Sequence, residues 1–166
     1  MRLLNIYTLN FEEFLGNDIP PYAILSHRWG SQEVSYKQFF KRIWGDRAGY
    51  EKIFNCCNFG TQRATTAATD EDDGWMHKTL SWVWIDTVCI DKRSSAELSE
   101  AINSMFHWYD GAAECWVHLA DVPSLGTTSE GEIMRAFRKS NWFTRGWTLQ
   151  VSNTTTAIIW SSLSYR

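Results

Sequence analysis

The fold of this chain is decided by Tyr22-Ala-Ile-Leu-Ser-His-Arg-Trp-Gly30 and Ser81-Trp-Val-Trp-Ile-Asp-Thr-Val-Cys-Ile-Asp91. Each stretch is a short apolar run followed directly by polar side chains. A strand that is apolar on both faces is usually covered on both faces, as in the parallel sheet of an α/β layer fold. The ligand site of such folds lies just beyond the carboxyl ends of the strands. The first candidate site residues are therefore Ser26, His27, Asp86 and Asp91.

Strand and helix patterns alternate along the rest of the chain, which predicts right-handed βαβ crossovers and a parallel sheet. We predict strands at residues 22–27, 81–86 and 115–119. We predict helical segments at residues 36–43, from 50 onward, at 98–109, at 133–137 as a helix or a turn, and at 142–150. Ser94-Ser-Ala-Glu97 fits a capping box and marks the start of the helix that contains residues 98–109.

The composition indicates one globular domain with a sizeable core. The chain has 166 residues, 44% of them apolar. Its net charge of −3 gives no basic surface and argues against a nucleic-acid partner. No apolar run approaches the length of a membrane span, and the amino terminus lacks the apolar region of a signal peptide. We therefore expect a cytoplasmic protein with no membrane partner.

The cysteines do not suggest a metal site or a disulfide framework. Cys56, Cys57, Cys89 and Cys115 form no CxxC pair, and the last two stand in apolar strand contexts. Structural zinc usually requires such paired spacing. We therefore predict that the cysteine thiols are free and that the chain has no metal ligands.

Ser26 and His27 stand side by side where the first predicted strand ends. A hydroxyl and an imidazole in this place can hold a phosphate or a ribose, or transfer a proton. They can equally serve the structure, with Ser26 capping a turn and His27 bonding to the backbone. The sequence leaves both interpretations open.

Asp86 and Asp91 bracket Thr-Val-Cys-Ile after the second predicted strand. Carboxylates placed there can bind ribose hydroxyls or a divalent metal. A carboxylate can also anchor a loop by accepting backbone N–H bonds; we favour this structural role for Asp86 and leave Asp91 open. Cys89 with His27 as its base could form a nucleophilic pair. A lone cysteine in an apolar context is usually a packing residue, and we favour that interpretation.

Arg145-Gly-Trp147 places a cation and an aromatic plane close together. Such a pair can stack on a base and hold a pyrophosphate. A helix start with a buried tryptophan explains the same residues, and from these residues alone the plainer interpretation is favoured.

Residues 61–78 are rich in Thr, Asp and Ala and carry the acidic run Asp70-Glu-Asp-Asp73. Charge runs are usually exposed. We therefore predict a solvated loop insertion over residues 61–78 and assign it no part in a site.

Taken together, these motifs resemble the heterokaryon incompatibility (HET) domain of fungi. The matching stretches are Tyr22–Gly30, Val83–Asp91, Glu97–Tyr109, Cys115–Asp121 and Ser140–Gln150. The resemblance covers residues 1–150 apart from the insertion at 61–78. It divides the chain into an amino-terminal segment at 1–21, the HET domain at 22–150, and a tail at 151–166 that matches nothing in the family.

The resemblance implies a role in non-self recognition, in which HET proteins help to trigger programmed cell death when incompatible hyphae fuse. It implies a fold similar to the Toll/interleukin-1 receptor (TIR) domain, a flavodoxin-like three-layer α/β fold with a mostly parallel sheet. Some TIR relatives cleave NAD at the nicotinamide–ribose bond, so NAD or a related nucleotide is the implied ligand. The implied partners are other proteins, including further copies of this chain. The pocket is then expected near Ser26, His27, Asp86, Asp91, Arg145 and Trp147.

The sequence departs from the family after Gln150. HET domains usually continue with Glu-Leu, and that Glu matches the catalytic residue of TIR-type NAD glycohydrolases; this chain has Val151-Ser152 instead. Losing a charge-stabilising group typically lowers the rate by orders of magnitude, so we expect a non-catalytic module and keep NAD glycohydrolase as the alternative. We also hypothesise that residues 151–166 are translated intron, because codons for Gln-Val-Ser can spell a splice donor. The domain and its sheet would then be incomplete at the carboxyl end.

Overall fold

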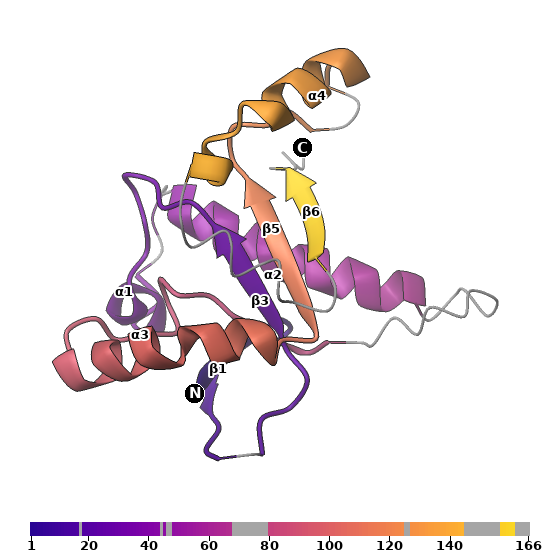
Figure 1. The fold of residues 1–166 in the computed structure, drawn as a ribbon. Helices are drawn as coiled ribbons and strands as arrows, with labels where there is room; N and C mark the ends of the chain where they lie inside the picture. Colours follow the sequence, from indigo (N-terminus) through magenta and orange to yellow (C-terminus); the bar gives the residue numbers. More distant parts are fainter. Residues whose placement is uncertain are drawn as a thin grey trace.

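The structure is a computed structural model that describes residues 1–16, 18–43, 45, 48–67, 80–124, 127–144 and 157–161. Figure 1 shows one sheet crossing the molecule, with α2 (Ala48–Ala67) behind it and α3 (Ser95–Asp110) in front. This is the α/β architecture that the apolar strands predict. No helix within the described ranges is long and apolar enough to cross a membrane.

The sheet has the strand order β2-β1-β4-β3-β5-β6. Its strands are β1 (Arg2–Asn5), β2 (Phe11–Glu13), β3 (Ala23–His27), β4 (Trp82–Trp84), β5 (Glu114–Leu119) and β6 (Ala157–Ser161). β3 lies between β4 and β5 and is parallel to both, and β6 is parallel to β5. β1 is antiparallel to both β2 and β4. The three strands predicted from the sequence are therefore adjacent and parallel, as expected.

Three strands were missed. β1 and β2 lie in the amino-terminal segment, where Leu3 and Leu4 of β1 are fully buried between β2 and β4. Two leucines between polar neighbours are too short a pattern to predict a strand. β6 lies in the tail and pairs in register with β5 from Cys115 to Leu119. The tail therefore covers one edge of β5, which would otherwise present unpaired backbone groups.

The remaining helices are α1 (Tyr36–Phe40), α4 (Glu130–Arg138) and the 3₁₀ helix η1 (Asn141–Thr144). α1 is shorter than predicted, because the chain leaves the helical region at Arg42, where φ is +51°. The helix predicted at residues 142–150 is 3₁₀ in its described part, and residues 145–150 lie outside the described residues.

The loop predicted for residues 61–78 is wrong for its first seven residues, because α2 continues to Ala67. No glycine or proline interrupts the helix after Gly60. Arg63, in this last part of α2, also forms an ion pair with Glu114 of β5, with Arg63 Nη2 and Glu114 Oε1 2.9 Å apart. The rest of the predicted loop, residues 68–78, lies outside the described residues.

The two faces of the sheet are covered by different helices. Trp84 of β4 is paired with Ile24 of β3, and Trp116 of β5 is paired with the residue that follows Ile24. Successive residues of a strand point to opposite faces, so the two tryptophans do so as well. Trp84 contacts Trp108 of α3, and Trp116 contacts Phe59 of α2. The site described below lies on the side of α3, at the carboxyl ends of β3 and β4.

The close approach of α2 to the sheet depends on Gly60. A Cβ atom there would lie 2.5 Å from Trp116 Cη2 and 3.0 Å from Ile6 Cδ1. Alanine usually stabilises a helix interior by about 1 kcal/mol relative to glycine. For Gly60→Ala we expect the reverse, a loss of about 1–3 kcal/mol in the free energy of unfolding, because the buried indole must shift.

The control is Gly131→Ala in α4, where an added Cβ meets nothing within 4 Å. This variant should be as stable as the parent protein or slightly more so. Urea denaturation of all three proteins measures the difference. Equal stabilities of the two alanine variants would show that α2 does not depend on this contact.

Candidate functional site

The carboxyl ends of β3 and β4 bring three of the predicted site residues together. Because the two strands are parallel neighbours, the residues that follow them meet at one edge of the sheet. His27 Nε2 lies 2.8 Å from Asp86 Oδ1. Ser26, His27 and Asp86 line the same pocket.

α2 supplies a buried lysine that the sequence analysis missed. Lys52 Nζ lies 2.7 Å from His27 Nδ1, and the lysine side chain is only 8% exposed. A lysine ammonium has three donors and no acceptor, so His27 Nδ1 is the acceptor. His27 Nε2 then carries the ring proton, and this N–H donates a hydrogen bond to Asp86 Oδ1. The tautomer of His27 is thus assigned by its two partners.

Glu33 balances the charge of Lys52. Glu33 Oε1 lies 2.5 Å from Lys52 Nζ and also accepts the backbone N–H of Gly30 at 2.6 Å. Burial lowers the pKa of Lys52, and the hydrogen bond and charge of Glu33 oppose this shift. The pair fastens the loop that follows β3 to α2 and holds a cation beside His27.

Asp86 is held as a carboxylate at the pocket. Its Oδ2 accepts a hydrogen bond from the indole N–H of Trp29 at 2.7 Å. Burial pushes the pKa of Asp86 upward, but the contact with His27, the Lys92 ammonium and Trp29 together bring this pKa below its usual value. We predicted that Asp86 anchors backbone N–H groups, whereas its hydrogen-bond donors among the described residues are the side chains of His27 and Trp29.

The pocket has a volume of about 230 Å³ and lies between the sheet edge and α3. Ser26, His27 and Asp86 form its polar side together with Lys92, and Trp29 and Trp84 contribute aromatic surface. One face of α3 forms the opposite wall, with residues at helical spacing. These wall residues are Leu98, Ile102, Met105 and Tyr109.

Ser26 also has a structural contact. Its hydroxyl accepts the indole N–H of Trp142 at 3.1 Å, across 116 residues of sequence. Ser140, at the start of the same segment, donates its hydroxyl to Asp121 Oδ1 at 2.6 Å. The segment that contains η1 is therefore docked onto the end of β3 beside the pocket.

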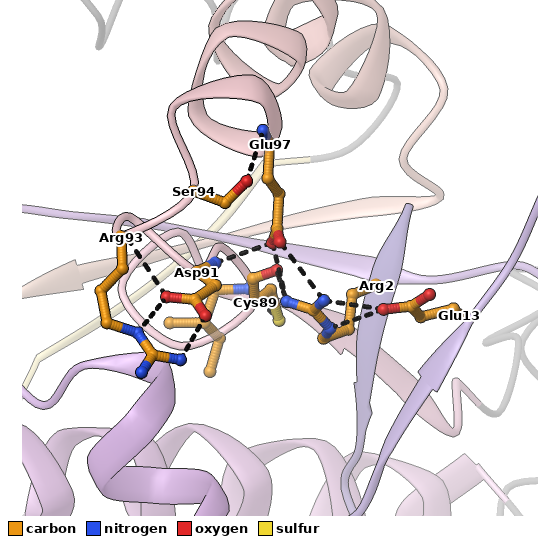
Figure 2. Close-up of polar contacts among 8 residues, drawn as sticks. Arg2, Glu13, Cys89, Asp91, Arg93, Ser94 and Glu97 are labelled. Atoms are coloured by element: carbon orange, nitrogen blue, oxygen red, sulfur yellow. Dashed lines mark hydrogen bonds and ion pairs between the residues drawn. The ribbon is translucent and has the colours of Figure 1, made fainter.

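Asp91 lies apart from the other predicted residues. Its carboxylate accepts two bonds from the Arg93 guanidinium, at 2.8 and 2.5 Å, and this contact lowers the pKa of Asp91. Its backbone N–H donates to Glu97 Oε1 at 2.7 Å. Figure 2 shows how Glu97 and Arg2 join this loop to α3 and to β1. Asp91 borders a second pocket of about 280 Å³, next to Lys37 and Arg93.

The other predicted positions lie outside the described residues. These are Arg145, Trp147 and Val151, the position at which the family glutamate was expected. Their place relative to the pocket stays a prediction.

The structure supports the packing interpretation of Cys89. All four cysteines are buried, free thiols. The Cys89 sulfur accepts the backbone N–H of Ile85 at 3.3 Å, and burial raises the pKa of this thiol to about 12. A protonated, enclosed thiol is a poor nucleophile. Among the described residues there is also no group of side chains that could hold a metal ion.

Sequence reasoning missed Lys52 and Trp29, although each left a signal. Lys52 precedes Ile53 and stands four residues before Cys56, on the apolar face of its helix. A lysine on such a face needs a buried partner. Trp29 stands two residues after His27 in a polar loop and is 46% exposed. Tryptophan is enriched at interfaces, because its ring is apolar and its N–H can donate a hydrogen bond.

His118 lies beside the site on β5. It is in register with His27 of β3 and is buried. Burial, reinforced by the nearby Lys52 and His27, lowers the pKa of His118 to about 3. His118 is therefore neutral wherever the protein is folded at ordinary pH.

Comparison with known proteins gives two matches. A family model described as heterokaryon incompatibility protein (HET) matches residues 22–129. A curated relative, the vegetative incompatibility protein HET-E-1 of Podospora anserina, is 46% identical over 136 residues. The match covers 80% of this chain but only 9% of the relative, so the chain corresponds to a small part of that protein. No solved structure matches the chain.

The contributions of Lys52 and Glu33 to the free energy of unfolding should be coupled. Lys52→Met leaves a largely buried carboxylate without its cation, and we expect a loss of about 2–4 kcal/mol in the free energy of unfolding. Lys52→Met combined with Glu33→Gln should recover much of this loss, because no uncompensated charge remains. Chemical denaturation of the parent, both single variants and the double variant gives the coupling energy. Additive losses would contradict the pairing.

His118 should make the protein less stable in mild acid. Its pKa is about 3 in the folded state and 6.5 in the reference state, so between these values the unfolded chain binds the extra proton. The free energy of unfolding should therefore fall by about 1.4 kcal/mol for each pH unit below 6.5. His118→Gln should remove this slope between about pH 6.5 and 5.5, where most carboxylates are still ionised. Urea denaturation at a series of pH values tests this, and equal slopes would refute it.

Proposed function

The chain belongs to the heterokaryon incompatibility (HET) family, and from this premise we propose that it is a signalling module of fungal non-self recognition. In this role it contributes to programmed cell death after incompatible hyphae fuse. It acts through contacts with other proteins or with further copies of itself. The name of its relative, a vegetative incompatibility protein, agrees with this role.

One observation carries the proposal: the region that matches the family is also the region that builds the pocket. Every residue lining the pocket lies between Leu25 and Tyr109, and the family match runs from residue 22 to residue 129. The family sequence therefore supplies both the sheet edge and the α3 wall. A pocket built in this way is best explained as a ligand site that serves the role of the family.

We further propose that the domain is a TIR-like variant of the flavodoxin-like fold. The parallel strands lie in the spatial order β4-β3-β5-β6, which is 2-1-3-4 in chain order. Flavodoxin-like sheets begin with this order. The antiparallel strands β1 and β2 extend the sheet on the side of β4. The order of the parallel strands supports the kinship.

The ligand that we propose is NAD or a related nucleotide. Trp29, Trp84 and Tyr109 give the pocket aromatic surfaces suited to a flat ring. Asp86, at the end of β4, is placed as the carboxylates that bind ribose hydroxyls are placed in related sheet architectures. These features support a nucleotide.

We propose that the module binds its ligand without turning it over. Both carboxylate oxygens of Asp86 already accept a hydrogen bond, from His27 and from Trp29. A base or nucleophile needs an oxygen that can reach the substrate. The residues of the pocket therefore favour recognition over chemistry.

NAD glycohydrolase is the second candidate, favoured by the charge of Asp86. The pKa of this carboxyl group is lowered although the pocket wall is mainly apolar. A fixed anion in such surroundings can stabilise the oxocarbenium-like centre of glycosidic cleavage. This activity needs no second catalytic group within the chain.

The proposal predicts a phenotype in cells that does not require NAD cleavage. Inducible expression of the full chain in a filamentous fungus should raise the fraction of hyphal compartments that take up a vital dye. Asp86→Asn should reduce that fraction several-fold, because the variant loses the charge of the pocket. Purified chain incubated with NAD should release no more nicotinamide than buffer alone.

The control is Lys37→Met, which changes an exposed lysine of α1 outside this pocket and should leave dye uptake unchanged. A thermal transition of each purified variant confirms that it is folded. Nicotinamide release that disappears in Asp86→Asn would replace the signalling module with the hydrolase. Equal dye uptake with all three proteins and with an empty vector would refute the role in cell death.

A further inference from the structure

We propose that Lys92 is a tethered cation that occupies the charge-binding position of this pocket, and that the ligand enters with a positively charged ring in its place. The inference rests on the proposed function only in taking this pocket as the ligand site. It adds the charge of the ligand and a residue that controls access.

A single indole ring organises this position. Lys92 Nζ lies 3.5 Å from the centroid of the Trp29 ring, over its face. The edge of the same indole donates its N–H to Asp86 Oδ2 at 2.7 Å. The negative face of the ring attracts a cation, and the carboxylate at its edge adds to that attraction. Trp29 and Asp86 together therefore make a cation-binding position, and the ammonium of Lys92 fills it.

Lys92 is held there loosely. Its ammonium forms no ion pair with any residue in the described part of the chain, in contrast to Lys52, which is paired with Glu33. Its backbone lies in the exposed loop after β4. Burial of the ammonium lowers the pKa of Lys92, and the Asp86 carboxylate only partly offsets this. An ammonium that is partly desolvated and not directly paired can be displaced by a cation that fits better.

The pocket beside Lys92 fits one ring. Its volume is about 230 Å³, and a cavity of about 150 Å³ is enough to hold benzene. The wall formed by α3 is apolar, and Trp84 and Tyr109 add aromatic surface. An inorganic cation would gain nothing from these walls. A flat organic cation would gain both the apolar contact and the charge of Asp86.

The electrostatics of the site favour a cation over an anion. The Lys92 ammonium adds a favourable charge to the two hydrogen bonds that Asp86 accepts, whereas Lys52 is paired with Glu33. Moving this ammonium away leaves the Asp86 carboxylate hydrogen-bonded to His27 and Trp29 but without the Lys92 charge, which is unfavourable in a mainly apolar pocket. A cationic ligand restores the balance, whereas an anionic group would meet a like charge.

The Lys92 ammonium can leave this pocket when a ligand enters. Three residues line both this pocket and the second one and so separate the two: Trp29, Ile90 and Lys92. The second pocket is also lined by Asp91, whose carboxylate is already paired with Arg93. Lys92 is itself an exposed residue, so the displaced ammonium can move into solvent without a new ion pair.

The test compares two small probes of the same shape, N-methylpyridinium and its neutral isostere toluene. Their binding to the full chain is followed by NMR, through the shift of the Trp29 indole N–H resonance. Lys92→Met removes the tethered charge and keeps a side chain of similar length. We expect it to bind N-methylpyridinium about tenfold more tightly than the parent protein does, with toluene affinity changed by less than about threefold.

Two further variants make the result specific. Lys37→Met removes an exposed lysine that lines only the second pocket, and it should bind both probes as the parent protein does. Adding Asp86→Asn to Lys92→Met should abolish the gain for N-methylpyridinium, with a thermal transition showing that the protein is folded. An unchanged N-methylpyridinium affinity in folded Lys92→Met would overturn the proposal, and so would an equal gain for toluene or for Lys37→Met. Because neither probe contains ribose or phosphate, the outcome does not depend on whether NAD is the ligand.

Discussion

The contact between His27 and Asp86 is the constraint on which the site depends. It exists because β3 and β4 are parallel neighbours, so that the residues following both strands reach the same edge of the sheet. Parallel pairing requires a long crossover, and here α1, α2 and residues 68–79 lie between the two strands in the chain. The same crossover delivers Lys52 to the other nitrogen of His27. One topological feature thus supplies the carboxylate, the imidazole and the cation.

The charges around His27 alternate along a chain of contacts. Glu33 is next to Lys52, Lys52 is next to the imidazole, and the imidazole is next to Asp86. In a partly buried region each of these charges would be unfavourable alone. The alternation makes them mutually stabilising and fixes the direction in which the imidazole donates. Such an arrangement holds a polar site rigid within an otherwise apolar fold.

The local sequence pattern predicted a strand correctly where the segment is buried on both faces. Residues 22–27 and 115–119 read as strands because nearly every side chain is apolar, and every residue of β3 and β5 is buried in the structure. The pattern was insufficient for β1, which contributes only two buried leucines. It misled for Thr61–Ala67, where polar residues continue a helix whose inner side packs on the sheet. Burial on one side is visible in a sequence only over a longer stretch.

The candidate site was also predicted only in part from the sequence. The position of Ser26, His27 and Asp86 at strand ends followed from the sequence, whereas Asp91 is turned toward Arg93. The partner of Asp91 is local, because Arg93 stands only two residues after it in the chain. Asp86 instead bonds to neighbours brought in by the fold, His27 and Trp29.

The sequence by itself determined the α/β class, the three central strands and the kinds of side chain at their ends, because these depend on residues close together in the chain. Only the tertiary structure decided which of those side chains meet. His27 contacts Lys52, which is 25 residues away in the sequence, and Asp86, which is 59 residues away. Ser26 contacts Trp142, which is 116 residues away. Such contacts depend on how whole helices and strands pack against one another. Packing involves surfaces built from distant parts of the chain, so the spacing of neighbouring residues does not encode it.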